Sequence, residues 1–133
     1  MKIIDIFESN GPTVLDWRVG ENLHVDGMSR QFKNLKMNPV KLVDVFGKPQ
    51  AFTDRLSDVD YMWEIEIDYK DSSHHDPSDK DDFDTVIFNI YTVKYDPDNL
   101  PPLDEQREWN IGARNKMTDK MIILDFLKSK KLL

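Results

Sequence analysis

The sequence predicts an α+β domain, in which a twisted antiparallel sheet of four to six strands is packed by two helices. Residues 61–69 and 84–95 alternate apolar and polar side chains with the period of two that a half-buried strand requires. Segments at 38–47 and at the C-terminus carry helix caps or a helical period. Since 133 residues can build one core but not two, we expect a single domain over 1–133.

The clearest strand is "YMWEIEIDY" at 61–69. Its odd-numbered residues are aromatic or aliphatic, and its even-numbered residues are Met62 and three carboxylates. The segment "DTVIFNIYTVKY" at 84–95 is rich in β-branched and aromatic residues, so we expect the two strands to pair antiparallel. Alternation alone places Glu64 and Glu66 on one face, and we interpret them as solvent-facing rather than as a catalytic pair.

A third strand is expected at "REWNIG", after a segment with three prolines, 96–106, that must leave the sheet. We expect this strand to stop at Gly112 in a turn. The turn would present Arg114, with Asn110 and Asn115 close by.

A helix is predicted at 38–47 by its ends. Asn38 suits the N-cap, Pro39 the first helical position, and Gly47 the left-handed position after the last turn. The side chains expected to face the core form one stripe: Val40, Val43 and Phe46.

A second helix is predicted in "MTDKMIILDFLKSKK", where lysines gather in the last turn and complement the helix dipole. The expected buried side consists of Met117, Met121, Leu124 and either Leu127 or Lys128. Near the N-terminus, "KIIDIF" fits either a strand or a helix. The segments "TVLDWRV" and "NLHV" look like short strands.

Most of the net charge of -7 lies in one segment. Residues 71–84 hold six aspartates and one lysine, which gives -5 and leaves -2 for the rest. A segment this polar cannot bury enough surface to offset its ordering entropy, so we expect a mobile hairpin tip. His74, His75 and Asp76 offer metal-ligand chemistry, but the glycine and glutamate of a helix-loop-helix calcium site are absent, and we expect no metal site.

Several function classes are excluded by missing residues. The chain has no cysteine, hence no disulfide, thiolate metal site or cysteine nucleophile. Phosphate-loop, serine-hydrolase and zinc-protease motifs are absent, and His24 stands alone, so we expect neither an enzyme nor a cofactor. No run approaches the ~20 apolar residues of a membrane span, and Asp5 and Glu8 interrupt the first apolar run. We therefore expect a cytoplasmic protein without signal peptide.

The remaining candidates are arginines and aromatic residues at the ends of elements. Arg30 follows Gly27 and Ser29, and Arg114 follows Gly112. Planar faces for an adenine ring, a guanidinium for a diphosphate and amides for ribose hydroxyls together suit a nucleotide. The aromatic residues that could supply such faces are Trp17, Phe88 and Tyr91. The alternative is that the aromatic residues form the core and the arginines are solvated.

Four blocks in order, "FG-P" (46–49), "YMWEIEI", "FNIYTVK" (88–94) and "EWNIG" (108–112), resemble a family of small bacteriophage proteins, the Thoeris anti-defence proteins of the first type. The resemblance covers about residues 38–116. It implies a sponge that sequesters a cyclic ADP-ribose signal, made by a Toll/interleukin-receptor-type enzyme, without cleaving it. It also implies a homodimer or higher homo-oligomer, and for some members the binding of cyclic oligonucleotides.

By position, the resemblance implies that Phe88 stacks on the base and that Arg114 contacts phosphate, with Arg30 as a second arginine. Where the family has a glycine-rich loop, this chain has "KYDPDNLPP", so the family's binding asparagine corresponds to Asp98 or Asn99, or is lost. Two further positions depart from the family pattern: Thr92 and Ala113. The expected ligand-binding set is Phe88, Arg114, Arg30, Asn99, Asn110, Tyr91 and Trp17.

The expected function is therefore sequestration of a cyclic nucleotide signal in the host cytoplasm, with no membrane or direct nucleic-acid partner. The alternative is an acidic mimic of DNA that blocks a restriction, repair or other DNA-binding enzyme. Such mimics spread carboxylates over a rigid surface at phosphate-like spacing. Here most of the charge lies in residues 71–84. A virion component is a third class, for which the sequence shows no positive sign.

Overall fold

The computed structural model describes residues 12–21, 23, 27–53, 56–94, 100–105 and 108–133. Their elements follow the order β1 (Thr13–Gly20), β2 (Met28–Lys36), α2 (Pro39–Phe46), β3 (Gln50–Ala51), β4 (Val59–Lys70), β5 (Asp84–Val93), β6 (Glu108–Arg114) and α3 (Met117–Ser129). In this part of the chain, two helices accompany a six-stranded antiparallel sheet that does not close, as predicted. The segment "KIIDIF", most of "NLHV" and part of the proline-rich segment lie outside the described residues.

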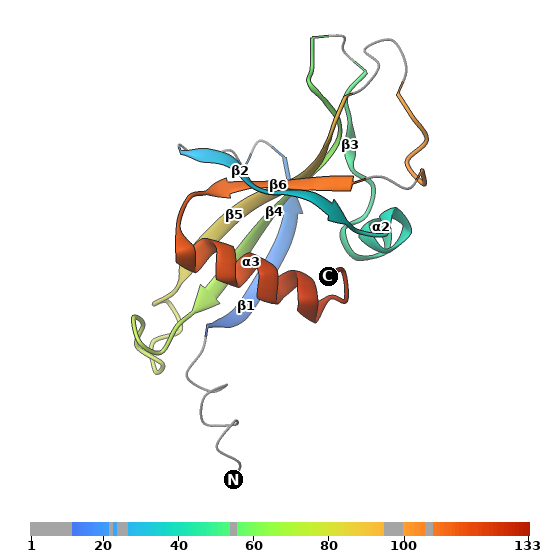
Figure 1. Ribbon diagram of the computed structural model, residues 1–133. Coiled ribbons are helices and arrows are strands. Elements are labelled where there is room, and N and C mark those ends of the chain that lie inside the picture. Colours follow the sequence, from blue (N-terminus) through green and yellow to red (C-terminus); the bar gives the residue numbers. More distant parts are fainter. Residues whose placement is uncertain (1–11, 22, 24–26, 54–55, 95–99, 106–107) are drawn as a thin grey trace.

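The sheet has the strand order β1-β4-β5-β6-β2, with the short β3 paired to β4 (Figure 1). The predicted hairpin of β4 and β5 is confirmed, with Tyr69 opposite Asp84 at one end and Val59 opposite Val93 at the other. At the far edge, β2 pairs with β6, which lies much later in the sequence. This long-range pairing brings the segment around Arg30 beside the end of β6.

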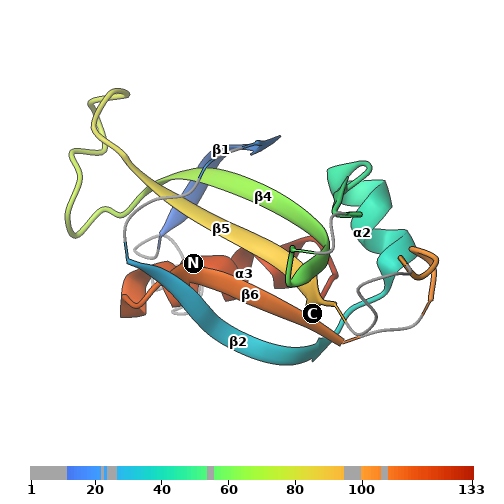
Figure 2. The same cartoon turned by 90° about the horizontal axis from the view of Figure 1, so that it is seen from above.

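One face of the sheet carries the core and α3 (Figure 2). Phe126 of α3 packs its ring 5.5 Å from Trp17, 6.3 Å from Phe46 and 6.3 Å from Phe88, measured between ring centroids. The odd-numbered residues of β4 from Tyr61 to Tyr69 and the even-numbered residues of β5 from Val86 to Thr92 point to this face and are buried. Burial of apolar surface contributes about 25 cal/mol per Å², so this layer accounts for most of the stability of the fold.

The buried side of α3 differs from the prediction except at Leu127, which is buried as expected. Met117 and Met121 are 71% and 51% exposed. The buried residues are Asp119, Ile122, Ile123, Phe126 and Leu127. Both sides of this helix carry apolar residues, but the side with two isoleucines, a phenylalanine and a leucine removes more apolar area from water, and it therefore faces the sheet.

The ends of α2 were predicted correctly, but its buried stripe was shifted. The Asn38 side chain accepts a 2.9 Å hydrogen bond from the N–H of Val40, and Gly47 has a φ of 81° after the last turn. The buried residues are Pro39, Leu42 and Phe46. Val40 is 56% exposed, because the stripe begins at Pro39 and not one residue later.

Gly112 is not a turn residue, which corrects the prediction for "EWNIGARNK". Strand β6 continues through it to Arg114. Gly112 lies opposite Asn89 on β5 and opposite Arg30 on β2. The Asn89 side chain lies over Gly112, in the space that a larger residue at position 112 would fill.

The acidic segment 71–84 projects beyond the β4–β5 hairpin (Figure 2) and contains a series of local turns. The carboxylates of Asp71 and Asp76 accept hydrogen bonds from the backbone and hydroxyl of Ser73 and Ser78, respectively. These bonds lower the pKa of both carboxyls, so both remain ionised. The mobility of the segment stays a prediction.

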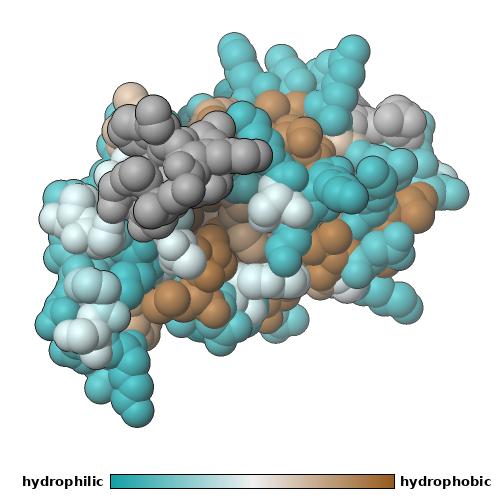
Figure 3. Space-filling model, turned by 90° about the horizontal axis from the view of Figure 1, so that it is seen from below, coloured by the Kyte–Doolittle hydropathy of each residue, from teal (hydrophilic) through white to brown (hydrophobic). Residues whose placement is uncertain are grey.

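On the face seen from below, apolar residues emerge as separate patches among hydrophilic ones (Figure 3). Large exposed apolar side chains include Leu15, Val40 and Met117. Among the described residues, no helix has the length and apolar character to cross a membrane.

Candidate ligand site on the open face of the sheet

The candidate site lies on the face of the sheet opposite α3. In the described part of the chain no helix covers this face, and Figure 2 views the sheet from this side. It carries the even-numbered residues of β4 from Met62 onward, including Glu64 and Glu66, as the strand alternation predicted.

One half of this face is an ion-pair cluster. Arg18 on β1 binds Glu66 and, through two guanidinium nitrogens at 3.0 and 3.1 Å, Asp68. The Thr85 hydroxyl donates a 2.8 Å hydrogen bond to Asp68. The hydrogen bonds from Arg18, and to a smaller extent the one from Thr85, lower the pKa of Asp68. Partial burial of the carboxyl opposes this shift. These charges are satisfied within the sheet.

The other half holds a hollow of about 280 Å³, which we call the open-face pocket. It is lined by Met28, Ser29, Arg30, Val59, Met62, Asn89, Tyr91 and Gly112. These residues come from β2, β4, β5 and β6. The floor is a row across three strands, in which Gly112 lies between Arg30 and Asn89. Gly112 adds no side chain to this floor, and the Asn89 amide lies over it.

Asn89 is fixed in this row by one hydrogen bond. Its Oδ1 accepts from the backbone N–H of Gly112 over 2.9 Å. Because a backbone N–H must bind an acceptor, this contact identifies the amide oxygen of Asn89. The Nδ2 group of the same amide can then donate a hydrogen bond to a ligand. A Cβ at residue 112 would lie 2.4 Å from Oδ1, so glycine is the residue that permits this arrangement.

Tyr91 and Arg30 provide the aromatic and cationic components of the pocket. Burial raises the pKa of the Tyr91 phenol, and the nearby charge of Arg30 opposes that rise. The phenol is therefore neutral and able to donate at ordinary pH. Arg30 is exposed and makes no ion pair with a carboxylate among the described residues, whereas Arg18 and Arg114 each do.

The lining is rich in donors. A guanidinium, an amide, a phenol and the Ser29 hydroxyl surround it, and no described carboxylate lines it. Glu64 continues the same row beyond Asn89, but its Oε2 accepts a 3.2 Å hydrogen bond from the N–H of Leu23 and lies outside the lining. Such a pocket suits an anion that also carries a planar or apolar group.

Of the predicted site residues, Arg30 and Tyr91 are brought together in the pocket. Asn110 lies opposite Tyr91 in the sheet but supports the neighbouring strand. Its Oδ1 accepts a 3.3 Å hydrogen bond from the N–H of Asn34, a residue with a φ of 57° at an irregular point of β2. Asn110 therefore shapes the strand that carries Arg30.

The structure places the other predicted residues elsewhere. Phe88 is fully buried beneath α3, on the opposite face from the pocket. Trp17 is also on the α3 side, with the Lys130 ammonium 5.1 Å from its ring centroid. Arg114 donates from Nε to Asp119 over 2.9 Å. Asn99 lies outside the described residues.

The sequence interpretation missed the role of Gly112 and five other lining residues: Asn89, Met62, Ser29, Met28 and Val59. A signal for Asn89 was present, because it is an amide within the otherwise apolar run "VIFNIYTV". Its position two residues before Tyr91 also predicts that both share a strand face. The position of Gly112 beside Asn89 depends on the register between β5 and β6, which local sequence patterns do not predict.

His75 has a structural place in the acidic segment. Its Nδ1 accepts a 2.9 Å hydrogen bond from the N–H of Asp71, so Nε2 carries the proton and donates over 3.0 Å to Asp84. The ring is buried against the edge of Tyr69. Within the described ranges, no group of three or more histidine, aspartate or glutamate side chains is arranged to hold a metal ion.

Comparison with known proteins adds no relative: no family model matches this chain, and neither a curated protein nor a solved structure matches it.

Proposed function

We propose that the protein binds a small phosphorylated nucleotide in the open-face pocket and releases it chemically unchanged. The observation that carries this proposal is the row of Arg30, Gly112 and Asn89, with Tyr91 beside it. It combines a cation without a carboxylate partner among the described residues, an oriented amide and an aromatic ring. These groups suit the recognition of a base together with a phosphate.

In the proposed complex, Arg30 binds a phosphate oxygen and the Nδ2 group of Asn89 donates to a phosphate or ribose oxygen. The Tyr91 ring contacts the base. Ligand pockets commonly enclose roughly 300–1,000 Å³, and the volume of about 280 Å³ here is at the lower limit. The pocket therefore holds about one nucleotide-sized portion, and the rest of a larger cyclic ligand would lie over the surface of the sheet.

A cyclic ADP-ribose-type signal is the ligand that the sequence resemblance suggests, and a cyclic oligonucleotide is the next. In this proposal the protein is a phage-encoded sponge in the host cytoplasm, acting as a homodimer or higher homo-oligomer. It prevents the signal from reaching its receptor by mass action, so it needs no chemistry of its own. The pocket supports the binding step, and its use of Arg30 and Tyr91 differs from the roles that the resemblance implies for Phe88 and Arg114.

The test is direct binding followed by recovery of the ligand. The protein is titrated calorimetrically with cyclic ADP-ribose and with cyclic dinucleotides, and the saturated complex is then denatured and chromatographed. We expect one ligand per pocket and recovery of the intact molecule. Absence of binding to the whole panel would overturn the proposal, and cleaved product in catalytic amounts would overturn the non-enzymatic part.

The DNA-mimic role is a second candidate, favoured by one observation. Residues 71–84 hold six aspartates and one lysine, and the segment projects beyond the β4–β5 hairpin. However, two of these carboxylates hold their own turns, and Glu66 and Asp68 are paired with Arg18. Inhibition of a restriction enzyme by the full chain, and its loss when the acidic segment is removed, would support this candidate.

A further inference from the structure

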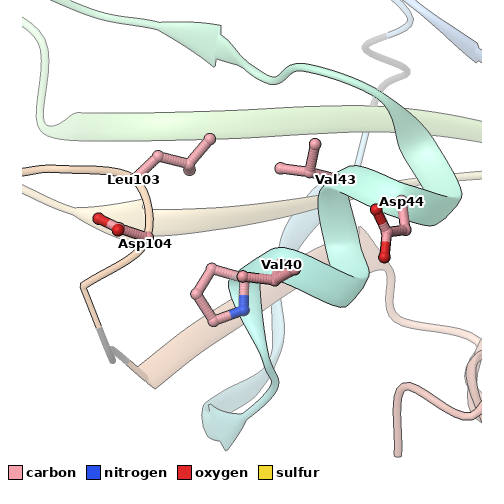
Figure 4. A pocket seen from close by; sticks show the side chains of 6 residues that line it. Val40, Val43, Asp44, Leu103 and Asp104 are labelled. Atoms are coloured by element: carbon pink, nitrogen blue, oxygen red, sulfur yellow. The ribbon is translucent and has the colours of Figure 1, made fainter.

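A second hollow of about 280 Å³ lies between α2 and the segment 100–105 (Figure 4). We call it the α2 groove. It is lined by Pro39, Val40, Val43 and Asp44 on the helix and by Leu103 and Asp104 on the loop. The described residues that line it are all different from those that line the open-face pocket.

Both walls of the groove are held by contacts to the rest of the fold. On the helix side, the Asn38 cap fixes the first turn of α2. On the loop side, the buried Tyr61 donates its hydroxyl to the carbonyl of Pro101 over 2.6 Å, and the N–H of Glu105 donates to the carbonyl of Pro102 over 3.1 Å. The groove is therefore formed in advance, which lowers the cost of ordering on binding.

The centre of the groove is apolar and its edges are acidic. Val43 and Leu103 pack against the core and form the base of the groove from opposite walls (Figure 4). Asp44 lies on the helix side and Asp104 on the loop side, and both are exposed. Neither makes an ion pair with a described residue, and no described lysine or arginine lines the groove.

Val40 adds to the groove an apolar surface that the core does not cover. It is 56% exposed on the same helix whose Leu42 is fully buried. An apolar surface between two carboxylates complements an apolar side chain with a cation on each side. A small amine supplies one such cation, whereas a peptide supplies two at a spacing set by its backbone.

We propose that the α2 groove docks a short segment of a partner protein, in which one leucine, methionine or phenylalanine is flanked on both sides by lysine or arginine. The apolar side chain enters between Val43 and Leu103, and the flanking cations lie against Asp44 and Asp104. The contact is small, so the interaction is transient and depends on salt. This site goes beyond nucleotide binding and does not depend on it.

The probe is a synthetic peptide library with a central leucine or phenylalanine and one arginine placed one to three residues away on each side. A matched library carries glutamate in place of each arginine. Fluorescence anisotropy at low salt measures binding to the full chain. We expect members of the basic library to bind and the acidic library not to bind. Equal binding of both libraries, or binding of neither, would overturn the proposal.

Variants then locate the contact. Reversal of both carboxylates, Asp44→Lys with Asp104→Lys, should weaken the best basic peptide by about tenfold or more and allow its acidic counterpart to bind. Asp125→Lys with Asp81→Lys, at two exposed sites outside the groove, changes the net charge by the same amount; this matched control should change affinity less than about twofold. An equal loss in this control would show that only net charge matters, and would refute a defined groove.

A last variant tests the occupant. Val40→Asp changes an exposed residue, so melting should be unaffected while peptide affinity falls. Arg30→Ala should leave peptide affinity unchanged, which separates this site from the nucleotide proposal. If sedimentation shows that the chain self-associates and that Val40→Asp abolishes the association, a second copy occupies the groove and the proposed partner is wrong.

Discussion

Asn89 and Gly112 face each other across β5 and β6, and the side chain of the first accepts a 2.9 Å hydrogen bond from the backbone N–H of the second. This contact explains why a glycine stands in the middle of a strand, where it costs backbone entropy. It also aims the free end of the amide into the pocket that contains Arg30 and Tyr91.

Gly112→Ala should disturb both stability and binding, because the new Cβ would lie 2.4 Å from the Asn89 oxygen. We expect a loss of about 1–3 kcal/mol in the free energy of unfolding, as for overpacked sites. Asn89→Ala removes the obstacle, so the double variant should be less destabilised than the sum of the single variants. Urea denaturation of the four proteins measures the coupling. Additive effects would mean that the two residues do not compete for this space.

Arg30→Ala should weaken nucleotide binding by about ten- to a hundredfold, equivalent to about 1.5–3 kcal/mol for a charge-assisted hydrogen bond. Arg30→Lys keeps the charge but loses the planar fork, so a partial loss would indicate bidentate contact with phosphate. The matched control is Arg18→Ala, which removes an arginine from the same face but outside the pocket. Calorimetry compares the three variants, and an Arg30→Ala protein with native affinity would remove this residue from the site.

Arg114→Ala should lower stability rather than affinity. Its partner Asp119 is only 2% exposed, and the variant would leave a buried carboxylate without its guanidinium. We expect the free energy of unfolding to fall by about 1.5–3 kcal/mol. Arg18→Ala, at an exposed ion pair, should lower it by less than about 1 kcal/mol. Replacing Asp119 by Asn in the same chain should recover part of the loss.

The same variant discriminates between two assignments of the site. The family resemblance predicts that Arg114 contacts phosphate, whereas the structure pairs it with Asp119 and places it outside the open-face pocket. Calorimetry at a temperature where the variant is fully folded is the measurement. A tenfold or larger loss of nucleotide affinity in folded Arg114→Ala would favour the resemblance.

Stability should decrease in acid partly through Asp68. Its pKa is lower in the folded protein than the ordinary value of about 3.9, because the Arg18 guanidinium and then the Thr85 hydroxyl bind its ionised form. The unfolded chain therefore takes up the proton first as the pH falls. The stabilisation is complete above the unfolded pKa and is lost as the pH falls through the folded one.

Asp68→Asn should flatten the dependence of the unfolding free energy on pH between about 5 and 2. Asp71 and Asp76 also have lowered pKa values, so part of the slope should remain. Arg18→Met should flatten it in the same sense, since it removes the main cause of the shift. Denaturation curves at a series of pH values provide the test, and an unchanged slope in Asp68→Asn would contradict the assignment.

The acidic segment should be dispensable for the fold. Since Tyr69 lies opposite Asp84, replacing residues 70–83 by Asn-Gly joins a register pair through a two-residue turn. We expect cooperative unfolding, with a loss of about 1–2 kcal/mol from the His75 hydrogen bonds and its contact with Tyr69. His75→Ala in the full chain isolates that contribution. A shortened chain without a cooperative transition would show that the segment is required.

Local patterns in the sequence were sufficient for the elements and for the two faces of the central strands. The Asn38 cap and the Gly47 end of α2 follow from short-range backbone chemistry. The alternation in β4 separates Trp63 from Glu64, since successive side chains on a strand point to opposite faces. The same rule places Phe88 and Tyr91 on opposite faces of β5, so the sequence implied that one of the two rings would be covered.

Only the tertiary structure decided which ring that was, and which arginine remained available. Helix α3 covers the Phe88 face, where the Phe126 ring packs against the fully buried Phe88. The pairing of β2 with β6 then brings Arg30 beside Gly112, across a long separation in the chain. Register between distant strands depends on the packing of the whole sheet, not on nearby residues. The sequence therefore determined the elements and their faces, and the fold alone determined which side chains meet at the pocket.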